Sequence, residues 1–209
     1  LIWYESAYSL GLSVDTEIYR FAWGVNIFDF ENDGDLDLYS GWGPVSNYGT
    51  GISSDDTLNQ PHTFWLNHNE EFRMMTSTWE INNNAIARGS IFTDLDHDGL
   101  QDLIIKNLDA PVEIWWGNCM NGDWISLQIE QDSMNRYGVG AKITSISESG
   151  QRTKWVISGD SFASGGPPIV HFGLGTISED FSDVIIELPT GEQYVQKLEK
   201  NLHHIVRLD

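Results

Sequence analysis

The stretch Asp94-Leu95-Asp96-His97-Asp98-Gly99-Leu100-Gln101-Asp102 sets carboxylates at alternate positions of a short loop. Two carboxylates about 4 Å apart repel each other by roughly 4 kcal/mol at an effective dielectric near 20. A calcium ion removes this repulsion, because it takes roughly six to eight oxygen ligands in a flexible shell. We therefore expect side-chain ligands at loop positions one, three, five and nine and a backbone carbonyl ligand at position seven: Asp94, Asp96, Asp98, Asp102 and Leu100. The alternative is an acidic, solvated hairpin turn without an ion.

The same pattern occurs 65 residues earlier, in Asp29-Phe30-Glu31-Asn32-Asp33-Gly34-Asp35-Leu36-Asp37. The offset extends beyond the acids, since Gly24 aligns with Gly89 in the strand-like segment before each loop. A pattern repeated in register predicts an internal structural repeat. The first loop then supplies a second candidate calcium site with five ligand positions: Asp29, Glu31, Asp33, Asp35 and Asp37.

The residues that flank these loops exclude the EF-hand, which needs a helix on each side and a bidentate Glu at position twelve. Position twelve is Ser40 in the first loop and Ile105 in the second. The flanks 21–28 and 103–105 are short, β-branched and aromatic, with an alternation closer to that of a strand than that of a helix. Each loop is therefore predicted to join two neighbouring antiparallel strands.

A strand, the pattern D-x-D-x-D-G-x-x-D and a second strand resemble the FG-GAP repeats that form blades of integrin-like β-propellers. The resemblance covers residues 1–120 and implies about two calcium-loop blades of a partial propeller. It also implies calcium at both loops, although Glu31 departs from the usual Asp at position three. Two blades cannot bury their own faces, so we expect a longer parent chain or another protein to supply the rest.

From about residue 121 the acidic loops stop and short strand-like runs alternate with glycines, which is typical of a sandwich or barrel. The runs are 124–129, 141–146, 154–157, 184–188 and 204–208. The motifs Asn135-Arg-Tyr-Gly-Val-Gly-Ala-Lys-Ile143, His171-Phe-Gly-Leu-Gly175 and Leu188-Pro-Thr-Gly191 resemble the ASPIC/UnbV domain. That domain commonly follows FG-GAP repeats in secreted proteins. The resemblance therefore implies an all-β chain in which an ASPIC/UnbV-like β-domain occupies residues 121–209.

The charge balance narrows the classes of partner. The chain of 209 residues has 11 Lys and Arg against 31 Asp and Glu, a formal net charge of −20. Nucleic acids and anionic membrane surfaces are bound through clustered basic residues, so both are excluded as expected partners. No apolar run is long enough to span a membrane as a helix.

We find no convincing catalytic constellation in the sequence, which lacks both a zinc-binding H-E-x-x-H and a G-x-S-x-G elbow. His203 and His204 are adjacent, so in a strand they point to opposite faces. His97 lies at loop position four, where a side chain usually points outward, and His171 is interpreted as structural. Trp115 and Trp116 are either core residues of a blade or platforms for carbohydrate, and the first interpretation is favoured.

These observations predict a calcium-stiffened extracellular or periplasmic scaffold that contacts other proteins or surface glycans and is not an enzyme. Its expected cofactor is Ca²⁺ at two sites. One alternative is an enzyme, or the accessory domain of one, that acts on polysaccharide or a secondary metabolite. Another is a fixed subunit of a larger secreted or envelope assembly, which a broad exposed apolar face would favour.

Overall fold

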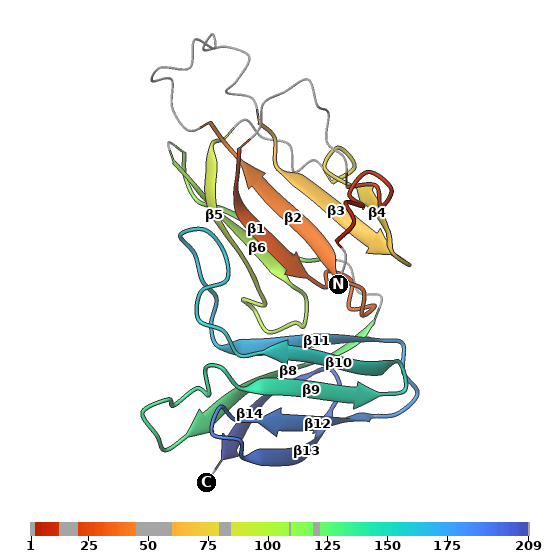
Figure 1. Cartoon of the computed structure of the whole chain (residues 1–209), viewed down its shortest axis with the longest axis vertical. Coiled ribbons are helices and arrows are strands. Elements are labelled where there is room, and N and C mark those ends of the chain that lie inside the picture. Colours follow the sequence, from red (N-terminus) through yellow and green to blue (C-terminus); the bar gives the residue numbers. More distant parts are fainter. Residues whose placement is uncertain are drawn as a thin grey trace.

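The computed structural model describes residues 3–12, 21–44, 60–79, 85–108, 110–118 and 122–208. All the elements of regular secondary structure in these ranges are β-strands. The predicted all-β class is thus confirmed. The strands make four sheets in the described ranges, and none of these sheets closes into a barrel. Figure 1 shows two sheets from residues 3–118 (the N-terminal half) stacked along the long axis on two sheets from residues 122–208 (the C-terminal half). A helix long and apolar enough to cross a membrane is not found in the described ranges.

The first sheet is an antiparallel meander in the order β1-β2-β3-β4. Its strands are β1 (Ala22–Phe28), β2 (Asp37–Trp42), β3 (Thr63–His68) and β4 (Glu71–Met74). The first acidic loop connects β1 to β2, as predicted, and β3 and β4 extend the same sheet.

The second sheet repeats this arrangement with three strands, β5 (Ala87–Thr93), β6 (Asp102–Asn107) and β7 (Glu113–Trp115). The second acidic loop connects β5 to β6, so it occupies the same place as the first loop does in its sheet. The two sheets share one core, in which the rings of Phe28 and Phe92 stack with centroids 3.4 Å apart. This packing on bulky aromatic rings fixes the two loops relative to each other.

The C-terminal half is a sandwich of two sheets around a single apolar core. One sheet has the order β10-β9-β12-β13, and the other has the order β11-β8-β14, in which β14 runs parallel to β8. The strands are β8 (Asp123–Gln131), β9 (Lys142–Ser147), β10 (Gly150–Trp155), β11 (Ile169–Gly175), β12 (Phe181–Glu187), β13 (Gln193–Glu199) and β14 (Leu202–Leu208). The core includes buried Ile125, Ile143, Phe172 and Val206.

The sequence reading of this half missed two strands and misplaced a third. We expected no strand at β11 or β13, and β10 begins four residues before the predicted run 154–157 and ends two residues before its end. β13 lies at one edge of its sheet, and Leu198 is its one buried residue, so its apolar signal is weak. The predicted domain boundary between residues 120 and 121 lies outside the described residues.

Candidate functional site

The two acidic loops share the hydrogen bonds that close their turns, at equivalent positions. At position one, Asp29 Oδ2 accepts from Gly34 N and Asp94 Oδ2 accepts from Gly99 N, both at 2.9 Å. At position five, Asp33 and Asp98 accept from the backbone N–H of position seven, both at 2.8 Å. The spacing in the sequence predicted that the two loops are equivalent. The structure adds that these aspartates accept the backbone hydrogen bonds that close each turn.

Position nine ties each loop to the next strand of its sheet. Asp37 accepts from Phe30 N at 2.7 Å and from Asn67 N at 2.8 Å. Asp102 accepts from Leu95 N at 2.8 Å and from Gly117 N at 2.9 Å. Both carboxylates are buried, so these charge-assisted bonds are worth more than exposed ones.

Positions four and six of both loops have left-handed backbone. The φ angles are 60° at Asn32 and 63° at His97, and 94° at Gly34 and 91° at Gly99. Glycine adopts this conformation freely, and asparagine and histidine are among the side chains that tolerate it. The chain therefore bends at the same two points in both loops, and position four becomes an outward corner.

The second loop meets the geometric requirement for a cation. Oxygen atoms of Asp94, Asp96 and Asp102 lie within 4.8 Å of one another, and they are the one group of three potential metal ligands found among the described residues. Ligands about 2.3–2.6 Å from a shared ion stand at most about 5 Å apart. Asp98 is exposed beside them, and the buried Leu100 occupies position seven, where only its carbonyl is available as a ligand.

In the first loop, the raised pKa values of the acids point to a bound cation more clearly than the positions of the ligand atoms do. Burial raises the pKa of Asp29 to about 6, against the lowering effect of the Lys154 ammonium. Burial raises the pKa of Asp37 to about 7, although backbone N–H groups bind its carboxylate. Burial and then the charges of the four neighbouring aspartates raise the pKa of Glu31 to about 8. A dication among these groups would favour their ionised forms.

One atom of the first loop points to the same conclusion. Asp29 Oδ1 is buried and has no hydrogen-bond partner, whereas a native buried carboxylate oxygen nearly always has one. At position seven the Asp35 side chain binds Asn69 N at 3.1 Å. The residues of both loops thus fit a hard oxygen-seeking cation, although the second loop alone brings three carboxylates together.

The corner residue Asn32 joins the first loop both to the second loop and to the C-terminal half. Its Nδ2 donates to Gly99 O at 3.0 Å, its Oδ1 lies 2.7 Å from His171 Nε2, and its carbonyl accepts from Gly175 N at 2.8 Å. The side chain is fully buried. Asn32, which stands between two predicted calcium ligands, is therefore also a main contact across the seam, by which we mean the contact zone between the two halves.

The seam requires glycine where the chains approach most closely. A Cβ atom on Gly173 would lie 2.0 Å from Asp29 Oδ2, and one on Gly99 would lie 2.0 Å from the Trp124 ring. Neither distance is possible between real atoms, so any larger residue at these points would push the halves apart. The His171-Phe-Gly-Leu-Gly175 motif of the second half is thus shaped to receive the first loop.

Two cations of β10 face the first loop. Arg152 Nε donates to Gly34 O at 3.3 Å, and the charges of Lys154 and Arg152 both lower the pKa of Asp29. The two residues are two positions apart in a strand, so they lie on the same face. The C-terminal half therefore offsets part of the negative charge of the first loop.

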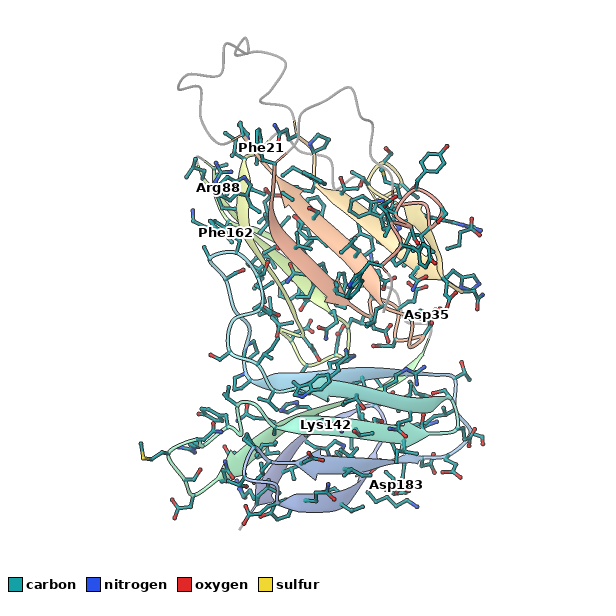
Figure 2. All side chains as sticks on the ribbon, in the orientation of Figure 1. Phe21, Asp35, Arg88, Lys142, Phe162 and Asp183 are labelled. Atoms are coloured by element: carbon teal, nitrogen blue, oxygen red, sulfur yellow. The ribbon has the colours of Figure 1, made fainter. Side chains whose placement is uncertain are left out.

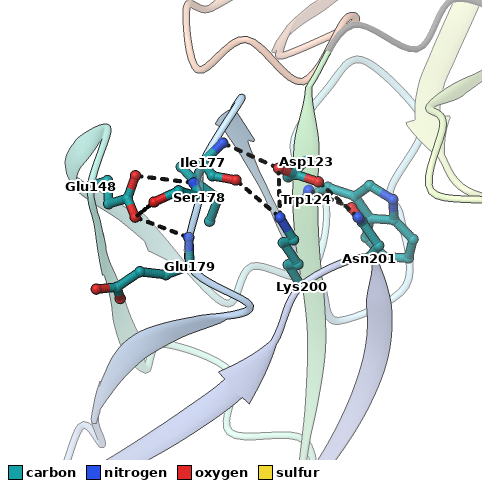
Figure 3. A network of polar contacts seen from close by, with 8 residues as sticks. All are labelled: Asp123, Trp124, Glu148, Ile177, Ser178, Glu179, Lys200 and Asn201. Atoms are coloured by element: carbon teal, nitrogen blue, oxygen red, sulfur yellow. Dashed lines mark hydrogen bonds and ion pairs between the residues drawn. The ribbon is translucent and has the colours of Figure 1, made fainter.

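A polar network fixes the start of β8, where the chain enters the C-terminal half (Figure 3). Asp123 accepts from Asn201 Nδ2 at 2.8 Å, from Ile177 N at 3.2 Å and from Lys200 Nζ at 3.2 Å. Asn201 Oδ1 also binds Trp124 N at 3.1 Å. These bonds hold the Trp124 backbone, and its ring covers Gly99 of the second loop.

The connection between β10 and β11 makes a second bridge across the seam. Ser161 Oγ accepts from Val25 N at 3.0 Å, and Ser164 Oγ donates to Ser90 O at 2.9 Å. The rings of Phe162 and Trp23 lie 4.8 Å apart, and Figure 2 shows Phe162 beside the N-terminal sheets below Arg88. Sequence reasoning did not place this connection at the seam.

The remaining singled-out side chains lie at the seam or beside the N-terminal core. His171 is held in the seam by Asn32 and stacks on Trp124. His97 points outward from its loop and lies beside His203, with ring centroids 5.5 Å apart. Trp115 packs against the N-terminal core, as favoured, whereas Trp116 is 58% exposed.

Comparison with known proteins supports part of this picture. Residues 131–206 match the family described as ASPIC and UnbV, so this part of the chain is similar to that domain. Over 109 residues, which are 50% of this chain, the sequence is 28% identical to cartilage acidic protein 1 of Homo sapiens. The identity to cartilage acidic protein 1 of Mus musculus is 27% over the same share. The chain spans 16% of the length of these relatives.

Proposed function

We propose that this protein is a calcium-stiffened extracellular scaffold, in which two FG-GAP-type blades carry Ca²⁺ loops that seat an ASPIC/UnbV domain. The observation that carries the proposal is the matched geometry of the two loops. Both close with equivalent hydrogen bonds, and both present their corner residues to the C-terminal half. The likeness to cartilage acidic protein 1 supports an extracellular setting. The partners that we propose there are other proteins or surface glycans.

Calcium would act mechanically in this scaffold. In the second loop Asp94, Asp96, Asp98 and Asp102 would hold the ion with the Leu100 carbonyl, and in the first loop the five acids from Asp29 to Asp37 would do so. An ion that binds only the folded loops stabilises the fold by mass action. Because the loops also form the seam, calcium would fix the angle between the two halves as well as the turns.

The metal-free protein is expected to lose stability as the pH rises from about 4 to about 8. The folded pKa values of Asp29, Asp37 and Glu31 are raised to about 6, 7 and 8. Over this range the folded chain keeps protons that the unfolded chain has released, so deprotonation favours unfolding. Melting temperatures measured in chelator across this range test the trend. Calcium should raise the melting temperature more at pH 8 than at pH 5.

Glu31→Gln is the matched control for that trend, because it removes the acid with the highest of the three pKa values and keeps the shape of the side chain. In chelator at pH 8 this variant should melt above the wild-type protein, and its stability should depend less on pH. In calcium the order should reverse, since a ligand is lost. A metal-free protein whose stability rises steadily up to pH 8 would contradict the account of the first loop.

We propose a binding role rather than a catalytic one. The nearest approach to a nucleophile–base pair in the described ranges is Ser126 Oγ at 2.8 Å from His203 Nδ1. These two residues are register partners on the parallel strands β8 and β14, so the contact follows from the fold itself. The loop aspartates at positions one, five and nine accept backbone N–H groups that close the turns, a function unrelated to proton transfer.

A further inference from the structure

The seam holds an open cavity of about 350 Å³ that neither the loops nor the sandwich core explains. Its walls come from both halves, with β1, β5 and the second loop on one side and β8, β10, β11 and β14 on the other. The volume lies at the lower end of the range of about 300–1,000 Å³ typical of small-molecule sites. A single water takes about 30 Å³, so the space is far larger than one bridging water needs.

The polar wall of this cavity offers donors and an acceptor at the same time. Lys154 Nζ makes one hydrogen bond, to His171 O at 2.7 Å, and an ammonium has three N–H groups. His171 also lines the cavity, and its Nδ1 is buried without a hydrogen-bond partner. Since Asn32 uses its Nδ2 on Gly99, its Oδ1 must accept from His171 Nε2, which leaves Nδ1 as an acceptor.

This combination favours a ligand atom that both donates and accepts a hydrogen bond. A carboxylate accepts from Lys154 but cannot donate to His171 Nδ1, and an ammonium does the reverse. A hydroxyl group does both, because it carries one donor and two acceptor lone pairs. The Ser126 hydroxyl and the His203 imidazole line the same cavity and add further groups that can donate or accept hydrogen bonds.

The mouth of the cavity is apolar. Ile27, Trp155 and Ile157 line it and keep 67%, 55% and 49% of their surfaces exposed. The indole ring of Trp155 offers a large, flat apolar face, and the C–H face of a sugar ring can pack flat against it. Asp94 and Asp160 also line the cavity of a chain whose net charge is −20, so an acidic ligand is disfavoured.

From these features we infer that the seam cavity binds a neutral saccharide unit, with its hydroxyl groups toward Lys154 and His171 and its apolar face against Trp155. The inference rests on the proposed binding role and deepens it, because it assigns surface glycans to a defined site. It also explains why Trp155 and Ile157 stay exposed at the seam when neighbouring Val156 is buried in the sandwich core.

Saturation-transfer NMR on the full chain tests this with methyl glucoside, methyl galactoside, methyl mannoside and N-acetylglucosamine at millimolar concentration. At least one should give a saturable signal, and Trp155→Ala should weaken it by roughly tenfold, equal to about 1.4 kcal/mol. Trp116→Ala is the matched control, because that indole is equally exposed at 58% but does not line this cavity. Melting curves of both variants check that the fold is intact.

Three outcomes would overturn the inference. The first is that none of the four neutral probes binds. The second is that glucuronate binds as well as the neutral probes, which would indicate pairing with the Lys154 charge. The third is that Trp116→Ala abolishes binding and Trp155→Ala does not. Calcium titration of the same preparation keeps the two claims apart, since calcium binding without saccharide binding refutes the cavity alone.

Discussion

Asn32→Gly should lower the free energy of unfolding by about 2–4 kcal/mol, because it leaves two buried groups of the seam without partners. The substitution removes the bond to Gly99 O at 3.0 Å and the bond to His171 Nε2 at 2.7 Å. Glycine suits the φ of 60° at this position, so the loss is assigned to the side chain and not to backbone strain. Denaturant unfolding in saturating calcium measures the change.

His97→Gly is the matched control, since His97 holds position four of the second loop with a φ of 63°. Its side chain is exposed, and its ring lies beside that of His203 with centroids 5.5 Å apart. This variant is expected to change stability by less than about 1 kcal/mol. Equal losses in the two variants would show that the corner conformation matters and that the Asn32 contacts do not.

Asp102→Ala should lower the free energy of unfolding by about 3–5 kcal/mol in calcium, the second of the two largest effects. The buried carboxylate accepts from Leu95 N at 2.8 Å and Gly117 N at 2.9 Å. Hydrogen bonds to a charged group contribute about 1.5–3 kcal/mol each. Part of the loss should persist in chelator, because these two bonds do not need the ion. Denaturant unfolding in both conditions separates the contributions.

Asp96→Asn is the control that isolates the ion. Asp96 is exposed, and its side chain accepts a long hydrogen bond from Asp98 N at 3.3 Å. In chelator the variant should differ from the wild-type protein by no more than about 0.5 kcal/mol. In calcium it should lose the stabilisation that the second site provides. If Asp102→Ala and Asp96→Asn behaved alike in both conditions, position nine would have no role beyond metal binding.

The loops were predictable because their chemistry is local. Carboxylates at alternate positions followed by glycine define one turn, and the 65-residue offset between Asp29 and Asp94 defines the repeat. Even the bonds from Asp37 and Asp102 to the next strand follow the same register in both sheets. Local spacing therefore determined both loops without any knowledge of the rest of the chain.

The seam was not predictable in the same way, because it joins residues that lie far apart in the sequence. Asn32 at position four gave no sign that it would bind His171, 139 residues later. One usable signal was present: Arg152 and Lys154 alternate in a strand and so offer two cations on one face, opposite an acidic repeat. The strand β11 was missed although its motif was recognised, since its glycines read as turns.

A calorimetric calcium titration of the chelator-stripped chain tests the central claim most directly. The account predicts two binding sites per chain, with Asp96→Asn leaving one and adding Glu31→Gln weakening that one. It also predicts a rise in melting temperature with each occupied site. The absence of binding up to several millimolar calcium would contradict the account, and the matched loops would then be acidic turns that close without an ion.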